Sequence, residues 1–107
     1  MVFIIAEIGT NHNQNIQTAK NLIIAIVEAG FDCVKFQTYE DFEIVGNEVS
    51  ARDYGLEKYY GDISAAEMFS KHLRTPKDWF PELRDMCRQS GIDCATTIHG
   101  KHGLDWA

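Results

Sequence analysis

Apolar residues concentrate in short runs along the chain, and the three clearest runs span residues 2–8, 33–38 and 92–97. The first run is almost continuously hydrophobic, which is typical of a strand in a parallel sheet with both faces covered. Successive side chains of a strand point to opposite faces of the sheet. Glu7 is therefore expected on the face opposite Ile8, and Lys35 and Gln37 are expected to share one face of the second strand.

A helical pattern follows the first predicted strand. Apolar positions recur every three or four residues from Ile16 to Ala29, which predicts an amphipathic helix. Asn15 stands where an N-cap residue belongs, and Gly30 stands where a left-handed residue commonly follows a helix. The second strand is then reached within a few residues, so the first half of the chain predicts a strand, a helix and a strand.

The second half predicts a long connection and two more helices. Residues 39–62 show no clear period, and a connection of this length is usually a functional or mobile loop. A capping box that begins at Ser64 predicts a helix to about Leu73. Thr75 as N-cap and Pro76 at the first helical position predict the next helix, which precedes the third strand.

Alternating strands and helices imply a parallel sheet with right-handed crossovers. Gly9 stands without the G-x-G-x-x-G pattern of dinucleotide-binding sheets. Polar residues gather at the C-terminal ends of the strands, where barrel enzymes carry their active sites. The expected fold class is therefore α/β, with about three βα units from the N-terminal portion of a TIM (β/α)8 barrel. Residues 1–107 form one partial domain, because a whole barrel needs roughly 250 residues.

Composition narrows the classes of partner. The chain has 107 residues and a net charge of −6, from 16 acidic and 10 basic residues. This balance argues against nucleic acid or an anionic membrane as the main partner, but one well-placed lysine is enough to bind an anionic small molecule. Three cysteines without a C-x-x-C pair suit a reducing cytoplasm, and no segment approaches the length of a membrane span.

Glu7 and Lys35 are the residues whose placement demands an explanation. A charged side chain within an apolar strand is costly to bury unless it has a partner or a ligand. A functional site satisfies this requirement. The alternatives are that Glu7 reaches solvent or caps the next helix, and that Lys35 lies on an edge strand with a solvated face.

A family resemblance favours the functional interpretation. It rests on three motifs in order along the chain: Glu7-Ile8-Gly9 followed by Asn11-His12, then Val34-Lys35-Phe36-Gln37-Thr38, then Thr96-Thr97. The set resembles the sialic acid synthase (N-acetylneuraminate synthase) family over about residues 3 to 105. That resemblance implies a transferase that forms a carbon–carbon bond between phosphoenolpyruvate and an N-acetylated amino sugar such as N-acetylmannosamine.

The resemblance also implies roles for individual residues. Lys35 matches the lysine that holds phosphoenolpyruvate, Thr97 matches a hydroxyl on the same ligand, and Glu7 matches the catalytic-site carboxylate. The residues expected to contact or shape the amino-sugar side are Gln37, Asn11 and His12. Gln14 departs from the family, which usually has Gly at that position.

The full-length family implies a divalent metal, Mn or Mg, whose ligands are not expected in this chain, and a homodimer. The 107 residues alone are accordingly expected to be inactive. Two other interpretations stay open from the sequence. One is a truncated, non-catalytic remnant that binds a sugar phosphate or a partner protein. The other is a different phosphoenolpyruvate-using, aldol-type barrel enzyme.

Overall fold

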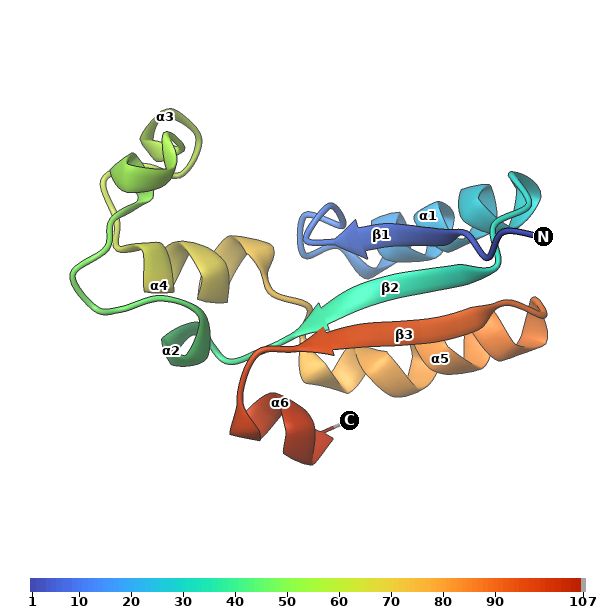
Figure 1. Ribbon diagram of the computed structural model, residues 1–107. Helices are drawn as coiled ribbons and strands as arrows, with labels where there is room; N and C mark the ends of the chain where they lie inside the picture. Colours follow the sequence, from blue (N-terminus) through green and yellow to red (C-terminus); the bar gives the residue numbers. More distant parts are fainter. Residues whose placement is uncertain (107) are drawn as a thin grey trace.

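The computed structural model describes residues 1–106 and contains one parallel sheet of three strands (Figure 1). The strands are β1 (Ile5–Gly9), β2 (Cys33–Thr38) and β3 (Asp93–Ile98), and they lie in sequence order, β1-β2-β3. All three predicted strands are confirmed. The first begins at Ile5 rather than at residue 2, and the apolar residues before it are exposed.

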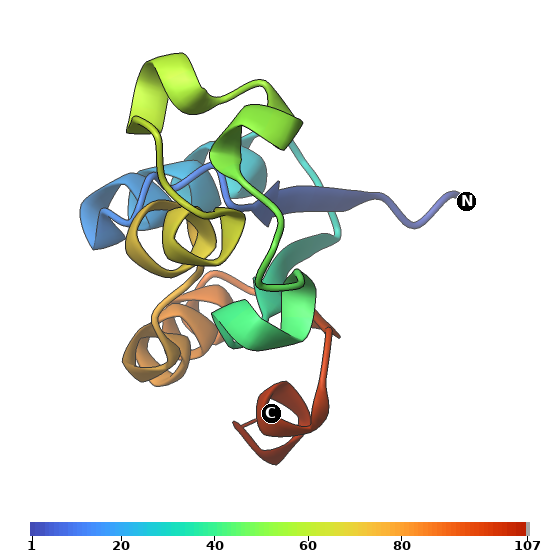
Figure 2. The same cartoon turned by 90° about the vertical axis from the view of Figure 1, so that its left-hand side faces the viewer.

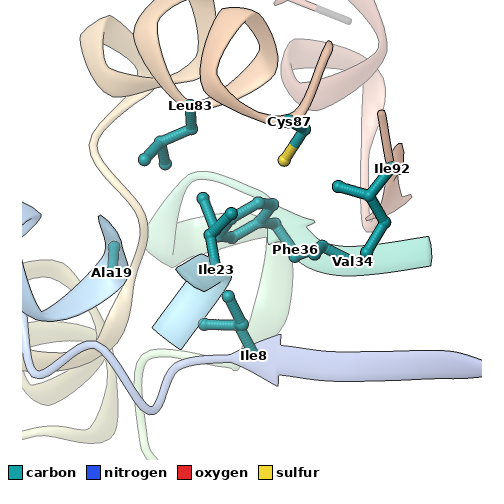
Figure 3. Close-up of a cluster of buried hydrophobic side chains, with 8 residues drawn as sticks. All are labelled: Ile8, Ala19, Ile23, Val34, Phe36, Leu83, Cys87 and Ile92. Carbon is teal, nitrogen blue, oxygen red and sulfur yellow. The ribbon is translucent and has the colours of Figure 1, made fainter. Parts of the chain in front are cut away.

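Two helices cover one side of the sheet. They are α1 (Ile16–Glu28) and α5 (Phe80–Gln89), and they lie on the same side of the strands in Figures 1 and 2. Their apolar stripes meet the sheet in a single buried cluster (Figure 3), formed by Ile8, Ala19, Ile23, Val34, Phe36, Leu83, Cys87 and Ile92. No helix of the described chain covers the opposite face.

The predicted ends of α1 are confirmed. The Asn15 side chain accepts hydrogen bonds from the amides of Gln17 and Thr18, which otherwise have no partner within the helix. Gly30 has a φ of +83°, the left-handed conformation that glycine adopts without strain.

The prediction of Thr75 as an N-cap is wrong. A 3-10 turn, η3 (Lys77–Trp79), separates Thr75 from α5, which begins at Phe80. The Thr75 hydroxyl is instead buried and hydrogen-bonded to the ring of His12, so tertiary pairing outweighs the local capping pattern.

The segment after β2 is more structured than its sequence predicts. It contains α2 (Asp41–Ile44), the 3-10 helix η1 (Ala51–Tyr54), and α3 (Glu57–Tyr60). The predicted helix from Ser64 to Leu73 is present as α4 (Ala65–Met68) and a π-helical turn, η2 (Phe69–Leu73). These elements lie beyond the C-terminal ends of the strands (Figure 1).

The last described element is α6 (Lys101–Trp106), which follows β3 after a short connection. Within residues 1–106, none of the helices has both the length and the hydropathy that a membrane span requires.

Candidate functional site

Four of the predicted site residues share the uncovered face of the sheet. In register, Glu7 is paired with Lys35 across β1 and β2, and Gln37 is paired with Thr97 across β2 and β3. Lys35 and Gln37 are two positions apart on the central strand, so their side chains point to the same face. The structure therefore brings carboxylate, ammonium, amide and hydroxyl groups together toward the C-terminal edge of the sheet.

Glu7 and Lys35 form an ion pair across the first two strands. The Glu7 Oε2 atom lies 2.9 Å from the Lys35 Nζ atom, and the two side chains are 40% and 36% exposed, respectively. Lys35 is therefore part-exposed and has a partner. It does not carry the large desolvation cost that is expected for a lysine in a strand covered on both faces. The cost is smaller because one face of β2 is open to solvent and Glu7 supplies the opposite charge.

Gly9 leaves space for the Glu7 carboxylate. The pairing of β1 with β2 shifts register between Glu7 and Gly9, and Gly9 has a φ of +54°. A Cβ atom at Gly9 would lie 3.0 Å from the Glu7 Oε1 atom. The absence of a side chain therefore accommodates both the backbone bend and the carboxylate that rests against it.

We expect Gly9→Ala to lower the free energy of unfolding by about 1 kcal/mol, because alanine is strained in the left-handed region. It should also displace the Glu7 carboxylate. Gly30→Ala is the matched control, since Gly30 has a φ of +83° but an added Cβ atom there would have open space around it. Chemical denaturation should give similar losses for both variants, while the NMR signals of Lys35 should move only in Gly9→Ala. Equal NMR changes in both variants would contradict the role assigned to Gly9.

The loop after β1 carries Asn11 and His12, and the structure places them differently. Asn11 is exposed, and its backbone amide closes the turn through a bond of 2.9 Å to the Ile8 carbonyl. His12 is fully buried, with Nδ1 accepting from the Gln14 amide at 3.0 Å and Nε2 bonded to the Thr75 hydroxyl at 2.7 Å.

Both ring nitrogens of His12 are thus engaged within the protein. Because Nδ1 accepts a hydrogen bond, the proton of the neutral ring is on Nε2, which donates a hydrogen bond to the Thr75 hydroxyl. Burial lowers the pKa of the ring below its ordinary value, so the neutral form is favoured. His12 has no polar atom left for a ligand in this structure. It can influence a sugar-binding side only by holding the loop.

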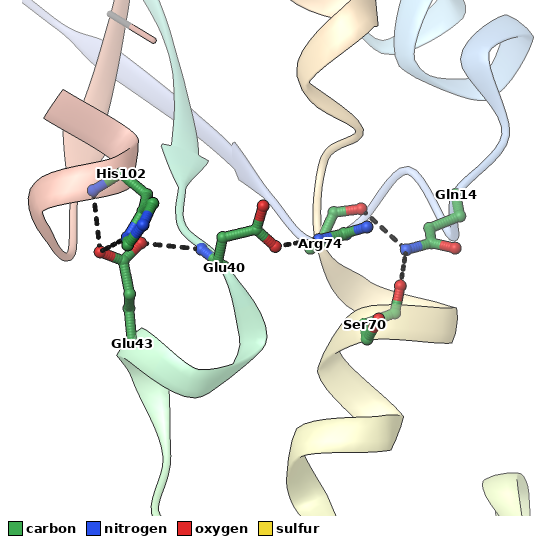
Figure 4. Close-up of polar contacts among 6 residues, drawn as sticks. All are labelled: Gln14, Glu40, Glu43, Ser70, Arg74 and His102. Atoms are coloured by element: carbon green, nitrogen blue, oxygen red, sulfur yellow. Dashed lines mark hydrogen bonds and ion pairs between the residues drawn. The ribbon is translucent and has the colours of Figure 1, made fainter. Parts of the chain in front are cut away.

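A chain of polar contacts joins the loops at the C-terminal edge (Figure 4). The Gln14 side-chain amide donates to the Ser70 and Arg74 carbonyls at 2.9 and 3.0 Å. The Arg74 guanidinium then forms an ion pair with Glu40, just after β2. Gln14 itself has a φ of +49°, in the left-handed region that glycine adopts more readily than other residues.

The series of polar contacts continues to the segment after β3. The Glu43 Oε1 atom accepts from the Glu40 amide at 3.0 Å, and its Oε2 atom accepts from the His102 amide at 3.0 Å. These hydrogen bonds hold the pKa of Glu43 below its ordinary value, and the hydrogen bond from the Glu40 amide has the largest effect. The sequence contains no signal for the pairing of Glu43 with His102, because these two residues are 59 positions apart along the chain.

No group of three or more His, Cys, Asp or Glu side chains is placed to hold a metal ion among residues 1–106. His102 contacts Glu43, and the ring of His99 packs edge-on against Tyr39 with centroids 5.6 Å apart. The described residues therefore do not provide a binding site for the divalent metal that the resemblance implies.

Comparison with known proteins agrees with the family resemblance of the sequence. The family model described as the NeuB family matches residues 22–106. An N,N'-diacetyllegionaminic acid synthase of Legionella pneumophila is 33% identical over 104 residues, which cover 97% of this chain and 29% of that protein. The spore coat polysaccharide biosynthesis protein SpsE of Bacillus subtilis is 34% identical over 106 residues, or 97% of this chain and 27% of that protein.

A solved structure shares the fold. The N-acetylneuraminic acid (sialic acid) synthetase of Leptospira borgpetersenii, crystallised with citrate, superposes with a TM-score of 0.72 and 26% identity. The match covers 98% of this chain and 32% of that one. The chain thus spans less than a third of the length of each of these relatives.

Proposed function

The chain belongs to the NeuB family, and from that premise we propose that it forms the N-terminal part of a synthase that condenses phosphoenolpyruvate with an N-acetylated amino sugar. One observation carries the proposal: Glu7, Lys35, Gln37 and Thr97 share one face of the sheet, in register. A site of this chemistry needs a cation for an anionic substrate, a carboxylate for proton transfer, and polar groups that orient hydroxyls.

We propose that the sheet is the first part of a (β/α)8 barrel and that the uncovered face lines its interior. Three features support this: the strands are parallel, they lie in sequence order, and the helices cover only one side. In such barrels, active-site residues lie at the C-terminal ends of the strands, where Gln37 and Thr97 are found.

In this proposal Lys35 binds the carboxylate or phosphate of phosphoenolpyruvate, and the Thr97 hydroxyl contacts the same molecule. Glu7 manages protons during carbon–carbon bond formation, and Gln37 contacts the amino sugar. Asn11 borders the sugar side, and His12 acts there through the loop that it fixes.

The identity of the sugar is left as a class. The relatives from Legionella pneumophila and Leptospira borgpetersenii are named for different products, N,N'-diacetyllegionaminic acid and N-acetylneuraminic acid. We propose no catalytic step through a metal ion, because residues 1–106 provide no suitable group of ligands. A homodimer and a cytoplasmic location stay predictions.

Binding of phosphoenolpyruvate to the chain tests the proposal directly. We expect Lys35→Met to weaken binding by about tenfold, or ~1.4 kcal/mol, as measured by isothermal titration calorimetry. The loss should be moderate because the ion pair is part-exposed. Lys71→Met is the matched control, since Lys71 lies on η2, away from the sheet face, and is likewise paired with a glutamate, Glu67. Equal affinity of Lys35→Met and the unsubstituted chain would overturn the assignment of Lys35.

A further inference from the structure

The positive charge on the uncovered face is already compensated. Lys35 is the only Lys, Arg or His within the three strands of the described chain. Its ammonium group lies 2.9 Å from the Glu7 carboxylate, which is within the distance of a charge-assisted hydrogen bond. An anion that binds Lys35 must therefore share the ammonium with Glu7 or displace the carboxylate from it.

The backbone at Gly9 leaves room for the carboxylate in this position. The Oε2 atom faces Lys35, while the Oε1 atom occupies space next to Gly9 that a Cβ atom would crowd, at 3.0 Å. Glu7 and Lys35 are also direct register partners, so the two side chains leave adjacent backbone positions in the same direction. The pair is thus preorganised before any ligand arrives.

We propose that Glu7 is the intramolecular counter-ion of Lys35 and competes with phosphoenolpyruvate for the ammonium group, which lowers the affinity of this face for the substrate. This inference rests on the proposed function and adds a regulatory element to the same site. Phosphoenolpyruvate carries a carboxylate and a phosphate, so its approach to Lys35 places like charges beside Glu7. Their repulsion is screened by water but not abolished, because both side chains are more than half covered.

The test compares phosphoenolpyruvate binding to the chain and its variants by isothermal titration calorimetry at low ionic strength. Glu7→Gln keeps the shape of the side chain and removes its charge, so we expect binding about three- to tenfold tighter. Glu67→Gln is the matched control: Glu67 is 39% exposed and also paired with a lysine, yet it lies on α4, away from the sheet. We expect its affinity to stay within about twofold of the unsubstituted chain.

The outcomes separate this inference from the proposed function. If Lys35→Met loses binding but Glu7→Gln binds no tighter than the unsubstituted chain, the competition is refuted and the proposed function stands. An equal gain in Glu67→Gln would also refute it, because the effect would then be one of net charge. Absence of binding in both the unsubstituted chain and Glu7→Gln would overturn both.

A second variant keeps the inference testable if Glu7→Gln does not fold, as judged by circular dichroism. Glu7→Asp retains the charge but is one methylene shorter, so its carboxylate can no longer approach Lys35 as closely. We expect a gain of about twofold for Glu7→Asp, smaller than that of Glu7→Gln. Affinity equal to or weaker than that of the unsubstituted chain would overturn the competition.

Discussion

Replacing Phe36 by Ala is expected to lower the free energy of unfolding by about 3–5 kcal/mol. Phe36 is 0% exposed, belongs to the buried cluster between the sheet and the helices α1 and α5, and makes an edge-to-face contact with Phe80 at 6.2 Å between centroids. The loss combines the transfer free energy of the ring with a cavity that the sheet and the two helices cannot fill. A chain of this size is typically stable by only about 5–15 kcal/mol, so the variant should lose a large share of its stability.

Urea denaturation followed by circular dichroism measures this effect. Phe3→Ala is the control, because the Phe3 side chain is 58% exposed, and we expect its unfolding free energy to change by no more than about 0.5 kcal/mol. Similar losses in the two variants would mean that the cluster does not form the core.

Stability is expected to fall with acidification in a window that His12 defines. The unfolded chain binds a proton on this ring near pH 6.5, whereas burial lowers the pKa of His12 in the folded chain. Between these two values the unfolded state holds more protons, so the free energy of unfolding decreases as the pH falls from about 6.5 toward the folded pKa. His12→Phe, which cannot take up a proton, should lose this part of the slope.

The hydrogen bond to Thr75 provides an independent measurement at neutral pH. Thr75→Val keeps the shape of the side chain but leaves the buried Nε2–H group of His12 without an acceptor, at an expected loss of about 1–3 kcal/mol. Thr75→Ser retains the hydroxyl and should lose less. If the stability of Thr75→Val and Thr75→Ser were the same, the hydrogen bond to Thr75 would contribute little, and the buried ring would be held by its contact with Trp79 and its hydrogen bond from the Gln14 amide.

The strands and α1 could be predicted because their signals are local. The apolar run before Glu7, the 3.6-residue spacing after Asn15 and the glycine at residue 30 each depend only on neighbouring positions. The short helices after β2 could not be predicted, since four residues are too few to show a period. The prediction of Thr75 as an N-cap is wrong because its hydrogen-bond partner, His12, lies 63 residues away along the chain.

For the candidate site, the alternation of strand side chains explains why Lys35 and Gln37 share a face. The register that sets Glu7 beside Lys35 depends on pairing between separate strands, which periodicity does not reveal. The exposure of the Glu7–Lys35 pair could not be predicted from the sequence either. A run of hydrophobic residues suggests a strand covered on both faces, whereas here the first residues of the run are exposed and the helices pack on one side only.

The order of the strands in the sheet has a consequence for how the chain folds as it is synthesised. Because spatial order equals sequence order, β1, α1 and β2 can pair as soon as residues 5–38 are available, before β3 exists. Closing β3 onto β2 requires the longer segment from Thr38 to Asp93, whereas β2 joins β1 across the shorter one from Gly9 to Cys33. The longer closure costs roughly 0.7 kcal/mol more chain entropy. We therefore expect the β1-α1-β2 unit to form early, with β3 and its polar edge added last.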